Sequence, residues 1–303
     1  MTLDPVLILS QLFNGLSLAS IMLLAALGLA LSFGLMRVIN MAHGELLMVG
    51  GYMGYVAYQN APGPAFLLLA LPLGFLCAAM LGGLLEMYVI HRLYGRPLDT
   101  LLATWGVGLM LQQTARTMFG ATGVSVLPPT WLNGAFLFHG GTLDGLGISY
   151  VRLFTIMIAL LGLAGMWLLL YKTKAGLYIR AVNQNREMAA ALGVNPRQID
   201  FLVFSLGSGL AGLAGATFAL IAPVTPTVGQ AYIVNAFMVV ILGGIGSLVG
   251  TSLSAVLVGS ISVLAETFFK VSFALVILLV FVVVFLQFKP TGLFSRRSRV
   301  LDE

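Results

Sequence analysis

The chain has 303 residues and a formal net charge of +5, with 59% hydrophobic residues and only 8% charged ones. Soluble domains carry roughly 25% charged residues, so this composition excludes an ordinary soluble globular protein. Together with a mean hydropathy of +1.03 it predicts an integral membrane protein. The single cysteine excludes a disulfide within the chain and a metal site built on several thiolates.

Apolar runs follow one another along the chain, and most can cross a hydrocarbon core of ~30 Å, which takes about 20 helical residues. The long first run indicates a helix that is tilted or divided near Gly28. Two runs, 46–59 and 233–246, are short for a full crossing and predict half-helices or broken helices. We predict an all-α fold, a polytopic transmembrane bundle of about 8–10 segments in a single domain over 1–303. The runs lie at about 6–36, 46–59, 65–90, 101–118, 151–171, 200–222, 233–246, 249–268 and 271–288.

Basic residues gather in three segments outside these runs. Loops rich in Lys and Arg stay on the cytoplasmic side, so the segments 91–100 and 171–200 and the tail 289–303 are predicted to be cytoplasmic. The stretch 119–150 contains no Lys or Arg and is predicted to be external. This threading places the N-terminus outside, the C-terminus inside and residues 37–45 on the cytoplasmic half.

The segment 171–200 is polar and basic, yet its NREMAAALG stretch predicts a short helix. Asn185 is a suitable N-cap, Glu187 favours the first turn, and Gly193 suits the position just after the helix. The alanines 189–191 are expected to form a smooth exposed ridge that fits a groove on another protein. An amphipathic connector resting on the membrane surface is the alternative.

Four motifs give the chain a resemblance to a known family: INMAHGELLMVGGYMG, NREMAAALGVNP, SLGSGLAGLAGA and VVILGGIGSLVGT. Over essentially the whole chain, they resemble the permease subunits of ABC importers for branched-chain amino acids and urea. Within that group, LLAALGLALSFGLMRVINMAHGE and RPLDTLLATWGVGLMLQQ are more similar to the urea permeases. Branched-chain relatives usually show a phenylalanine where this chain has Met41, and they lack the LATWGVGLMLQQ run.

The resemblance implies a bacterial inner-membrane permease that moves urea, or a similar small amide, by alternating access. A branched-chain amino acid permease is the alternative, and a stand-alone urea or amide carrier or channel is the second alternative. The implied partners are two ATPase subunits docked on 171–200, a periplasmic binding protein and a second, homologous permease chain. Membrane lipid surrounds the chain, and nucleic acid is not expected as a partner. The residues implied for ATPase coupling are Arg186, Glu187, Ala190, Ala191 and Gly193.

Catalytic and cofactor motifs are missing from the sequence. No G-x-x-x-x-G-K-[ST] occurs, so no cofactor is expected on this chain and ATP is expected to be used by the partner subunits. No H-E-x-x-H occurs, and the three histidines lie far apart in sequence, which disfavours an intramembrane enzyme. We therefore expect neither catalytic residues nor a metal site.

Polar side chains within or between the apolar runs are candidates for lining a path. Gln112 and Arg116 are four residues apart and share a helix face, and amide groups suit an uncharged planar substrate. Interhelical hydrogen bonding by Gln and snorkelling by Arg are the alternative. Glu266 is interpreted as an interfacial residue that neighbours Lys270, with a transport role as the alternative. The path candidates are Asn40, His43, Glu45, Glu86, Thr104, Gln112, Gln113 and Arg116.

Two glycine-rich stretches predict close packing and a break. The stretch GSGLAGLAGA puts small residues on adjacent helix faces, which favours helix packing within this chain or against the second permease. Its predicted packing residues are Gly207, Ala211, Gly212 and Gly215. The stretch LGGIGSLVGT does not meet the G-x-G-x-x-G spacing, and we expect a broken helix end that exposes backbone groups to a pathway or an interface.

The INMAHGE stretch places Asn40, His43 and Glu45 close together between two apolar runs. His43 and Glu45 are two residues apart, and residues at that spacing do not share a helix face. We expect a bend between two membrane segments, where these groups satisfy backbone atoms left free by the break. Gly44 permits the turn, and Arg37 is expected to pair with Glu45.

Overall fold

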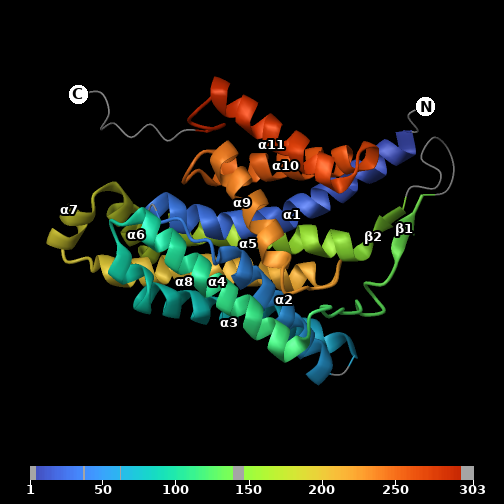
Figure 1. Ribbon diagram of the computed structural model, residues 1–303, viewed down its shortest axis with the longest axis horizontal. Coiled ribbons are helices and arrows are strands. Elements are labelled where there is room, and N and C mark those ends of the chain that lie inside the picture. The colour runs from blue at the N-terminus through green and yellow to red at the C-terminus, as the bar shows by residue number, and fades with distance from the viewer. Residues whose placement is uncertain (1–4, 37, 62, 139–146, 295–303) are drawn as a thin grey trace.

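The computed structural model describes residues 5–36, 38–61, 63–138 and 147–294. The described chain is helical apart from its connections and one short hairpin, so the predicted all-α fold is confirmed (Figure 1). The helices in the first half are α1 Pro5–Met36, α2 His43–Asn60, η1 Gly63–Ala65, α3 Phe66–Tyr88, η2 Ile90–Leu93 and α4 Pro97–Phe119. The strands β1 Ala135–Leu137 and β2 Gly147–Ser149 pair antiparallel. The remaining helices are α5 Tyr150–Lys172, α6 Lys174–Gln184, α7 Arg186–Ala191, α8 Pro196–Phe218, α9 Val228–Gly243, α10 Leu248–Phe268 and α11 Val271–Phe288.

The predicted apolar runs correspond to the long helices. Among the described residues, six helical segments are long and apolar enough to span a membrane, and they correspond to α1, α3, α5, α8, α10 and α11. The polytopic bundle is therefore confirmed for the described residues. The long first run is one continuous helix, so the option of a division near Gly28 is wrong.

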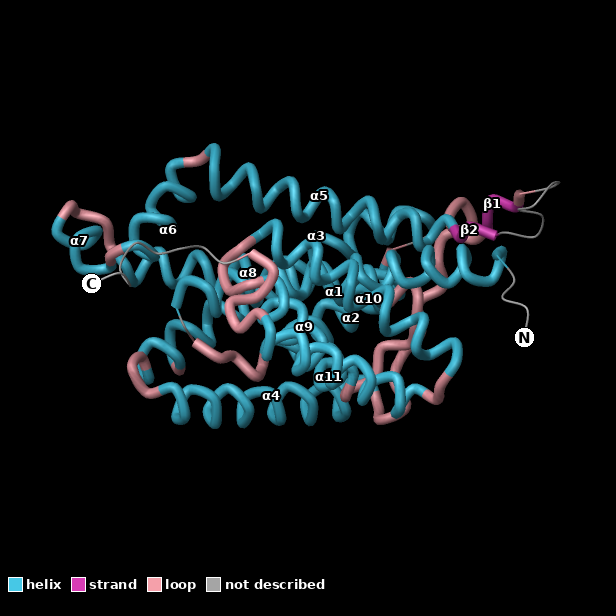
Figure 2. The backbone as a smooth tube through the Cα atoms, turned by 90° about the horizontal axis from the view of Figure 1, so that it is seen from above, coloured by secondary structure: helices cyan, strands magenta, loops and turns pink. Residues whose placement is uncertain are grey.

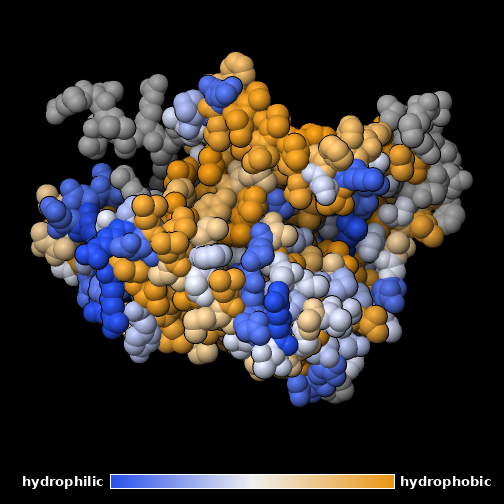
Figure 3. All heavy atoms as spheres, viewed as in Figure 1, coloured by the Kyte–Doolittle hydropathy of each residue, from blue (hydrophilic) through white to orange (hydrophobic). Residues whose placement is uncertain are grey.

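The two ends of the bundle differ in structure and composition. The helices α6 and α7 lie at one end, and the β1–β2 hairpin lies at the other (Figure 1). On the visible face, apolar residues cover much of the upper middle, and one of the clusters of hydrophilic residues lies at the α6–α7 end (Figure 3). The helices α4 and α5 flank the bundle on opposite sides (Figure 2).

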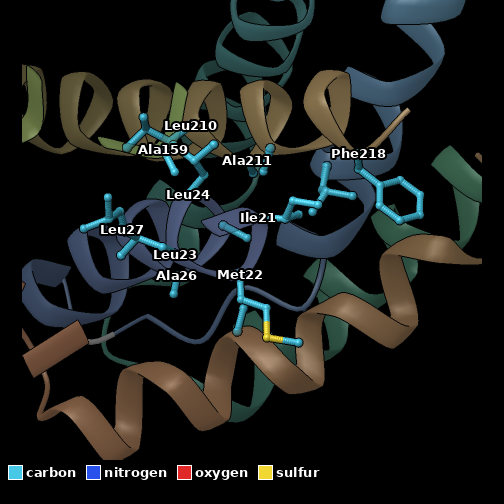
Figure 4. Packing of buried hydrophobic residues seen from close by; sticks show 14 of the residues in the cluster. Ile21, Met22, Leu23, Leu24, Ala26, Leu27, Ala159, Leu210, Ala211 and Phe218 are labelled. Carbon is cyan, nitrogen blue, oxygen red and sulfur yellow. The ribbon is translucent and has the colours of Figure 1, made fainter. Parts of the chain in front are cut away.

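The core of the bundle forms around α1. Leu24 and Leu27 are fully buried, and Ile21 is 1% exposed. In Figure 4 these side chains lie between α8, which contributes Leu210 and Phe218, and the neighbouring helices. Because α1 contacts other helices on all sides, its hydrophobic residues do not need to form a single stripe.

The helices α2 and α9 begin in the middle of the bundle. The ring nitrogen Nε2 of His43 lies 2.9 Å from the carbonyl oxygen of Ala25. At a rise of ~1.5 Å per residue, Ala25 lies roughly 16 Å from the end of α1 at Met36. Gly44 in turn packs directly against Gly229, in the first turn of α9. The chain therefore re-enters the bundle before each helix, which confirms the expected half-helices.

These contacts divide most of the bundle into two similar halves that run in opposite directions. The set α1, α2 and α3 has its counterpart in α8, α9 and α10. Thus α3 packs on α8 as α10 packs on α1, and α2 packs on α3 as α9 packs on α10. The two halves cross where Gly28 meets Gly207: a Cβ built on Gly28 would lie 2.1 Å from the Gly207 carbonyl oxygen. Only glycine permits this approach of the two backbones.

The small residues of α8 lie inside the chain rather than at a free surface. A Cβ on Gly212 would lie 2.2 Å from the carbonyl oxygen of Gly74 in α3. A Cβ on Gly215 would lie 1.8 Å from that of Leu47 in α2. The helices thus pack on the residues predicted for packing, which are Gly207, Ala211, Gly212 and Gly215.

The break between α9 and α10 is covered by the segment that follows α11. Gly244 takes a φ of 93° and ends α9. The carbonyl oxygen of Leu242 accepts a hydrogen bond from the Leu293 amide at 2.8 Å, and that of Gly243 accepts one from the Phe294 amide at 3.2 Å. The expectation that this helix end exposes its backbone is therefore wrong for these two carbonyls, because the chain satisfies them itself.

Candidate functional site

The INMAHGE stretch forms the predicted bend. Asn40 and His43 bond to backbone atoms as expected, whereas the expectation is wrong for Glu45, which bonds to a side chain. The side-chain oxygen of Asn40 accepts a hydrogen bond from the Ala42 amide at 3.0 Å. His43 is 2% exposed and reaches the Ala25 carbonyl of α1. The bend thus replaces part of the bonding that a continuous helix would provide in lipid.

Glu45 lies at the centre of the junction between α2 and α9. Its Oε1 accepts a hydrogen bond from Nε2 of Gln112 at 2.7 Å. Its Oε2 is buried and has no hydrogen-bond partner among the described residues, and a Cβ on Gly229 would lie 2.6 Å from it. The carboxylate therefore lies at the N-terminal ends of two helices, whose dipoles favour negative charge. Arg37, the expected partner, lies outside the described residues.

A cavity of about 210 Å³ opens beside this carboxylate. Its polar groups come from α2, α4 and α9, and its remaining lining is apolar. The helix α4 forms one wall and lies apart from the centre of the bundle (Figure 2). We call this space the junction cavity; it is lined by Met41, Glu45, Trp105, Gln112, Gln230 and Ile233, among others.

The helix α4 places its predicted path residues on different sides. Thr104 is fully buried, and its hydroxyl accepts a hydrogen bond from the Met41 amide at 3.1 Å. Gln112 faces Glu45, whereas Gln113 and Arg116 are exposed. The expectation that Arg116 shares a site with Gln112 is therefore not met. Among the described residues α4 contacts mainly α2 and η2, and the sequence alone did not show which side of α4 faces them.

The residue Gln230 was missed by sequence reasoning. It lies in the first turn of α9, three residues before the apolar run that begins at 233. Because it lines the junction cavity together with Glu45, the structure adds an amide group from the second half of the chain. The only signal in the sequence was its position at the start of a short run, where half-helix ends form binding sites.

Glu86 belongs to a different cluster, at the α6–α7 end. It is 1% exposed, and its Oε1 accepts a hydrogen bond from the Tyr94 hydroxyl at 3.2 Å. The guanidinium of Arg186 lies 5.4 Å from the centre of the Tyr94 ring and forms an ion pair with Asp200. The Asp200 side chain is 3% exposed. Burial, followed by the charge of Asp200, raises the pKa of Tyr94, which keeps its hydroxyl protonated as a donor.

The short helix α7 has the ends that the sequence predicts. The side chain of Asn185 accepts a hydrogen bond from the Met188 amide at 2.9 Å. Gly193 takes a φ of 87°, and its amide donates to the Ala190 carbonyl, while the next amide donates to the Ala189 carbonyl, both at 3.0 Å. This pair of bonds is a Schellman motif, which requires a left-handed residue.

The exposed surface of α7 is narrower than expected. Ala189 is only 4% exposed and packs inward, so the predicted ridge of three alanines is wrong at that residue. The side chain of Arg186 turns toward Asp200 and Tyr94. The other residues proposed for coupling are exposed: Glu187, Ala190, Ala191 and Gly193.

Within the described part of the chain, no three His, Cys, Asp or Glu side chains gather as metal ligands would. His43 contacts α1, whereas Glu45 contacts α4, so the two neighbours in sequence do not form a joint site. The chemistry available at the junction is hydrogen bonding by a carboxylate and amides within a largely apolar cavity.

Comparisons with known proteins support the resemblance. The family model described as the permease component of branched-chain amino acid transport systems matches residues 11–287. The branched-chain amino acid permease BraD of Pseudomonas aeruginosa is 28% identical, over 95% of this chain and 96% of the relative. The branched-chain amino acid permease LivH of Escherichia coli is 26% identical, over 95% of this chain and 96% of the relative. The ribose import permease RbsC of Escherichia coli is 35% identical over 100 residues, 31% of each chain. No solved structure matches.

Proposed function

The chain belongs to the permease family of branched-chain amino acid transport systems, and from this premise we propose which solute it moves and how it is driven. As a family member it is the multi-pass inner-membrane subunit of an ABC importer, a class that works with ATPase and substrate-binding partners. Its role is transport, as in the relatives.

The first substrate class that we propose is branched-chain amino acids. The relatives that match over nearly their whole length bear that description, and they support it better than they support urea, which the sequence motifs favoured. Identity of 26–28% is compatible with a change of substrate within one fold, so the assignment needs a direct test.

Urea is the second candidate, because a specific feature favours it. The run LLATWGVGLMLQQ, which resembles urea permeases, supplies Thr104, Trp105 and Gln112. The last two line the junction cavity, and Gln112 donates there to Glu45. A cavity with amide and carboxylate groups can bind the NH₂ groups and the carbonyl of urea.

Uptake of labelled leucine and labelled urea separates these candidates. Cells that lack the chain are compared with cells that express it together with its ATPase and binding-protein partners. Uptake of leucine that depends on the chain supports the first class, and uptake of urea supports the second. A stand-alone carrier is supported instead if the purified chain transports in liposomes without ATP.

We propose that the solute passes through the junction cavity. Glu45, Gln112 and Gln230 supply its polar contacts, and the half-helices α2 and α9 change their relative position during alternating access. The observation that supports this most directly is the buried Oε2 of Glu45, which has no partner in the described chain. Such a group inside a membrane protein is costly and marks a functional site by default.

Coupling to ATP hydrolysis is proposed to run through α7. Its exposed residues Glu187, Ala190, Ala191 and Gly193 form the surface for the ATPase. Arg186 connects this surface to the bundle, because it pairs with Asp200 on α8 and covers Tyr94, which in turn bonds to Glu86 on α3. A movement of α7 is therefore transmitted to α3 and α8. These two helices pack most closely on each other and on α2.

In the proposed assembly two ATPase subunits bind the α6–α7 end, and a second permease chain completes the pore. The binding protein docks at the opposite end, near the β1–β2 hairpin. No cofactor is assigned to this chain, and ATP is used by the partner subunits.

Substitution of Arg186 by Gln tests the coupling path. We expect import to fall about tenfold, because the buried Asp200 loses its cation, while the ATPase subunits still co-purify. Arg96→Gln is the matched control, since Arg96 lies at the same end in an exposed pair with Asp99. Equal import by the two variants contradicts the role of Arg186.

A further inference from the structure

A second cavity lies at the end of the bundle that carries the β1–β2 hairpin. It measures about 290 Å³, near the lower limit for pockets that hold small organic ligands. Its walls are formed by the first turn of α5, the N-terminal half of α1, the end of α8 with the chain just after it, α9 and the last turns of α10. By the distribution of basic residues this end is external, so the cavity faces the side from which an importer receives its solute. We call it the outer cavity.

Two opposite charges line the outer cavity without pairing with each other. Arg152 projects from the first turn of α5, and Glu266 from the last turn of α10. In the described chain, neither side chain forms an ion pair or a hydrogen bond, and no guanidinium nitrogen of Arg152 lies within 4 Å of a Glu266 carboxylate oxygen. The sequence predicts Glu266 to be an interfacial residue that neighbours Lys270, and it gives no sign of a role for Arg152. Glu266 is exposed and Arg152 is partly exposed at this cavity, so both charges are free to bind ligand groups of opposite sign.

Further polar groups and an apolar wall complete the cavity. Ser17 is fully buried, lines the cavity, and its hydroxyl has no partner among the described residues. Gln11 and Asn14 lie one turn away and bond to each other at 3.2 Å. The apolar side chains are Leu18, Ile21, Phe218, Ile221 and Val263.

We propose that the outer cavity binds a zwitterionic α-amino acid with an aliphatic side chain. Arg152 binds the carboxylate, Glu266 binds the ammonium group, and the apolar wall takes the side chain. Guanidinium groups suit planar carboxylates, and the free hydroxyl of Ser17 adds a hydrogen bond. The uncharged urea molecule offers no such pair of opposite charges. This inference rests on the proposed function and selects between its two substrate classes.

Transport by the complete complex tests the proposal. The probes are labelled leucine, with unlabelled isoamylamine and 4-methylpentanoate as competitors that lack the carboxylate and the ammonium group, respectively. For Arg152→Gln and Glu266→Gln we expect leucine uptake below saturation to fall about tenfold or more, because each removes one charge-assisted contact. Lys270→Gln is the matched control at the same end, and we expect it to transport like the parent.

The competitors test whether both charged groups of the solute are needed for binding. We expect isoamylamine and 4-methylpentanoate to inhibit far less than leucine, because each lacks one of the two charged contacts. Parental leucine uptake in both Gln variants overturns the site and leaves the importer assignment intact. Absence of leucine uptake by the parent, with urea uptake present, overturns the amino acid class and the site together.

Cysteine labelling gives a measurement that does not depend on transport. Val263→Cys, in a chain whose single cysteine is removed by Cys77→Ser, places a thiol on the apolar wall and keeps both charges. We expect leucine to slow its reaction with a methanethiosulfonate reagent, and urea at equal concentration to leave it unchanged. Equal protection by leucine and urea, or none by leucine, overturns the proposal.

Discussion

The two halves of the bundle use the same backbone device and different chemistry. In the second half, Pro223 and Pro226 lie in the connection between α8 and α9, and the segment 219–230 contains no ionisable residue. In the first half, the connection between α1 and α2 contains no proline and carries the buried Asn40, with His43 and Glu45 in the first turn of α2.

This difference shows how each break is made. Proline stops a helix by removing an amide donor and by steric clash. The first break instead depends on side chains that replace lost backbone bonds, such as Asn40 to the Ala42 amide. The second break is therefore structural, whereas the first also brings a carboxylate to the centre of the bundle.

The largest expected effect is a loss of stability when a larger side chain separates the two halves where they cross. Gly28→Val places a side chain where even a Cβ would lie 2.1 Å from the Gly207 carbonyl oxygen. We expect a loss of about 3 kcal/mol or more from overpacking, and little folded protein. Gly106→Val is the control, because a Cβ on Gly106 meets nothing within 4 Å. The measurement is the yield of monodisperse protein in detergent, and similar yields for both variants refute the close crossing.

The next largest effect, on solute import, is expected when the carboxylate that distinguishes the two halves is removed. Glu45→Ala leaves the Gln112 amide without its acceptor, and we expect solute import to fall about tenfold or more while the protein still inserts. Gln230→Ala changes the corresponding position of the second half, and we expect a smaller decrease. Import assays on matched amounts of membrane protein compare the two. If Gln230→Ala lowers import more than Glu45→Ala does, the greater importance of the first half is refuted.

A smaller effect is expected at the contact between α2 and α1. His43→Ala removes the hydrogen bond to the Ala25 carbonyl and leaves a small void, at a cost of about 2–3 kcal/mol. Thermal unfolding in detergent should show this as a lower midpoint. A midpoint equal to that of the parent would mean that His43 does not stabilise the bend.

The smallest effect is expected at a hydrogen bond within the second half, between α9 and α10. The hydroxyl of Ser254 on α10 donates to the Val239 carbonyl of α9 at 2.6 Å. Ser254→Ala should cost about 1 kcal/mol, as is usual for neutral hydrogen bonds between membrane helices. The same unfolding assay measures it, and a cost above that of His43→Ala would reverse the ranking of the two halves.

The sequence predicts most of the fold because lipid imposes simple constraints. Long apolar runs become helices, and the caps of α7 follow from Asn185 and Gly193. The sequence does not show which side of a helix faces its neighbours. Thus Arg116 proved exposed and Ala189 buried, because burial depends on helices far away in the chain. A division near Gly28 was one of two options for the long first run, and the structure instead uses this glycine for a close crossing.

The functional site was predictable only in part. INMAHGE stood out because polar side chains are rare in this chain, and the structure places Glu45 at a cavity. Its contact with Gln112, 67 residues away in sequence, has no local signal. The same holds for Gln230 and Arg152, which acquire their neighbours only when separate helices pack together.

The segment after α11 has a consequence for the time course of biosynthesis. The carbonyls of Leu242 and Gly243 receive their hydrogen bonds from Leu293 and Phe294, which leave the ribosome about fifty residues later. At ~5–20 residues per second, the end of α9 waits several seconds for its partners. During that interval these two carbonyls need other partners, such as water, and the second half of the bundle is completed only when the chain beyond α11 has emerged.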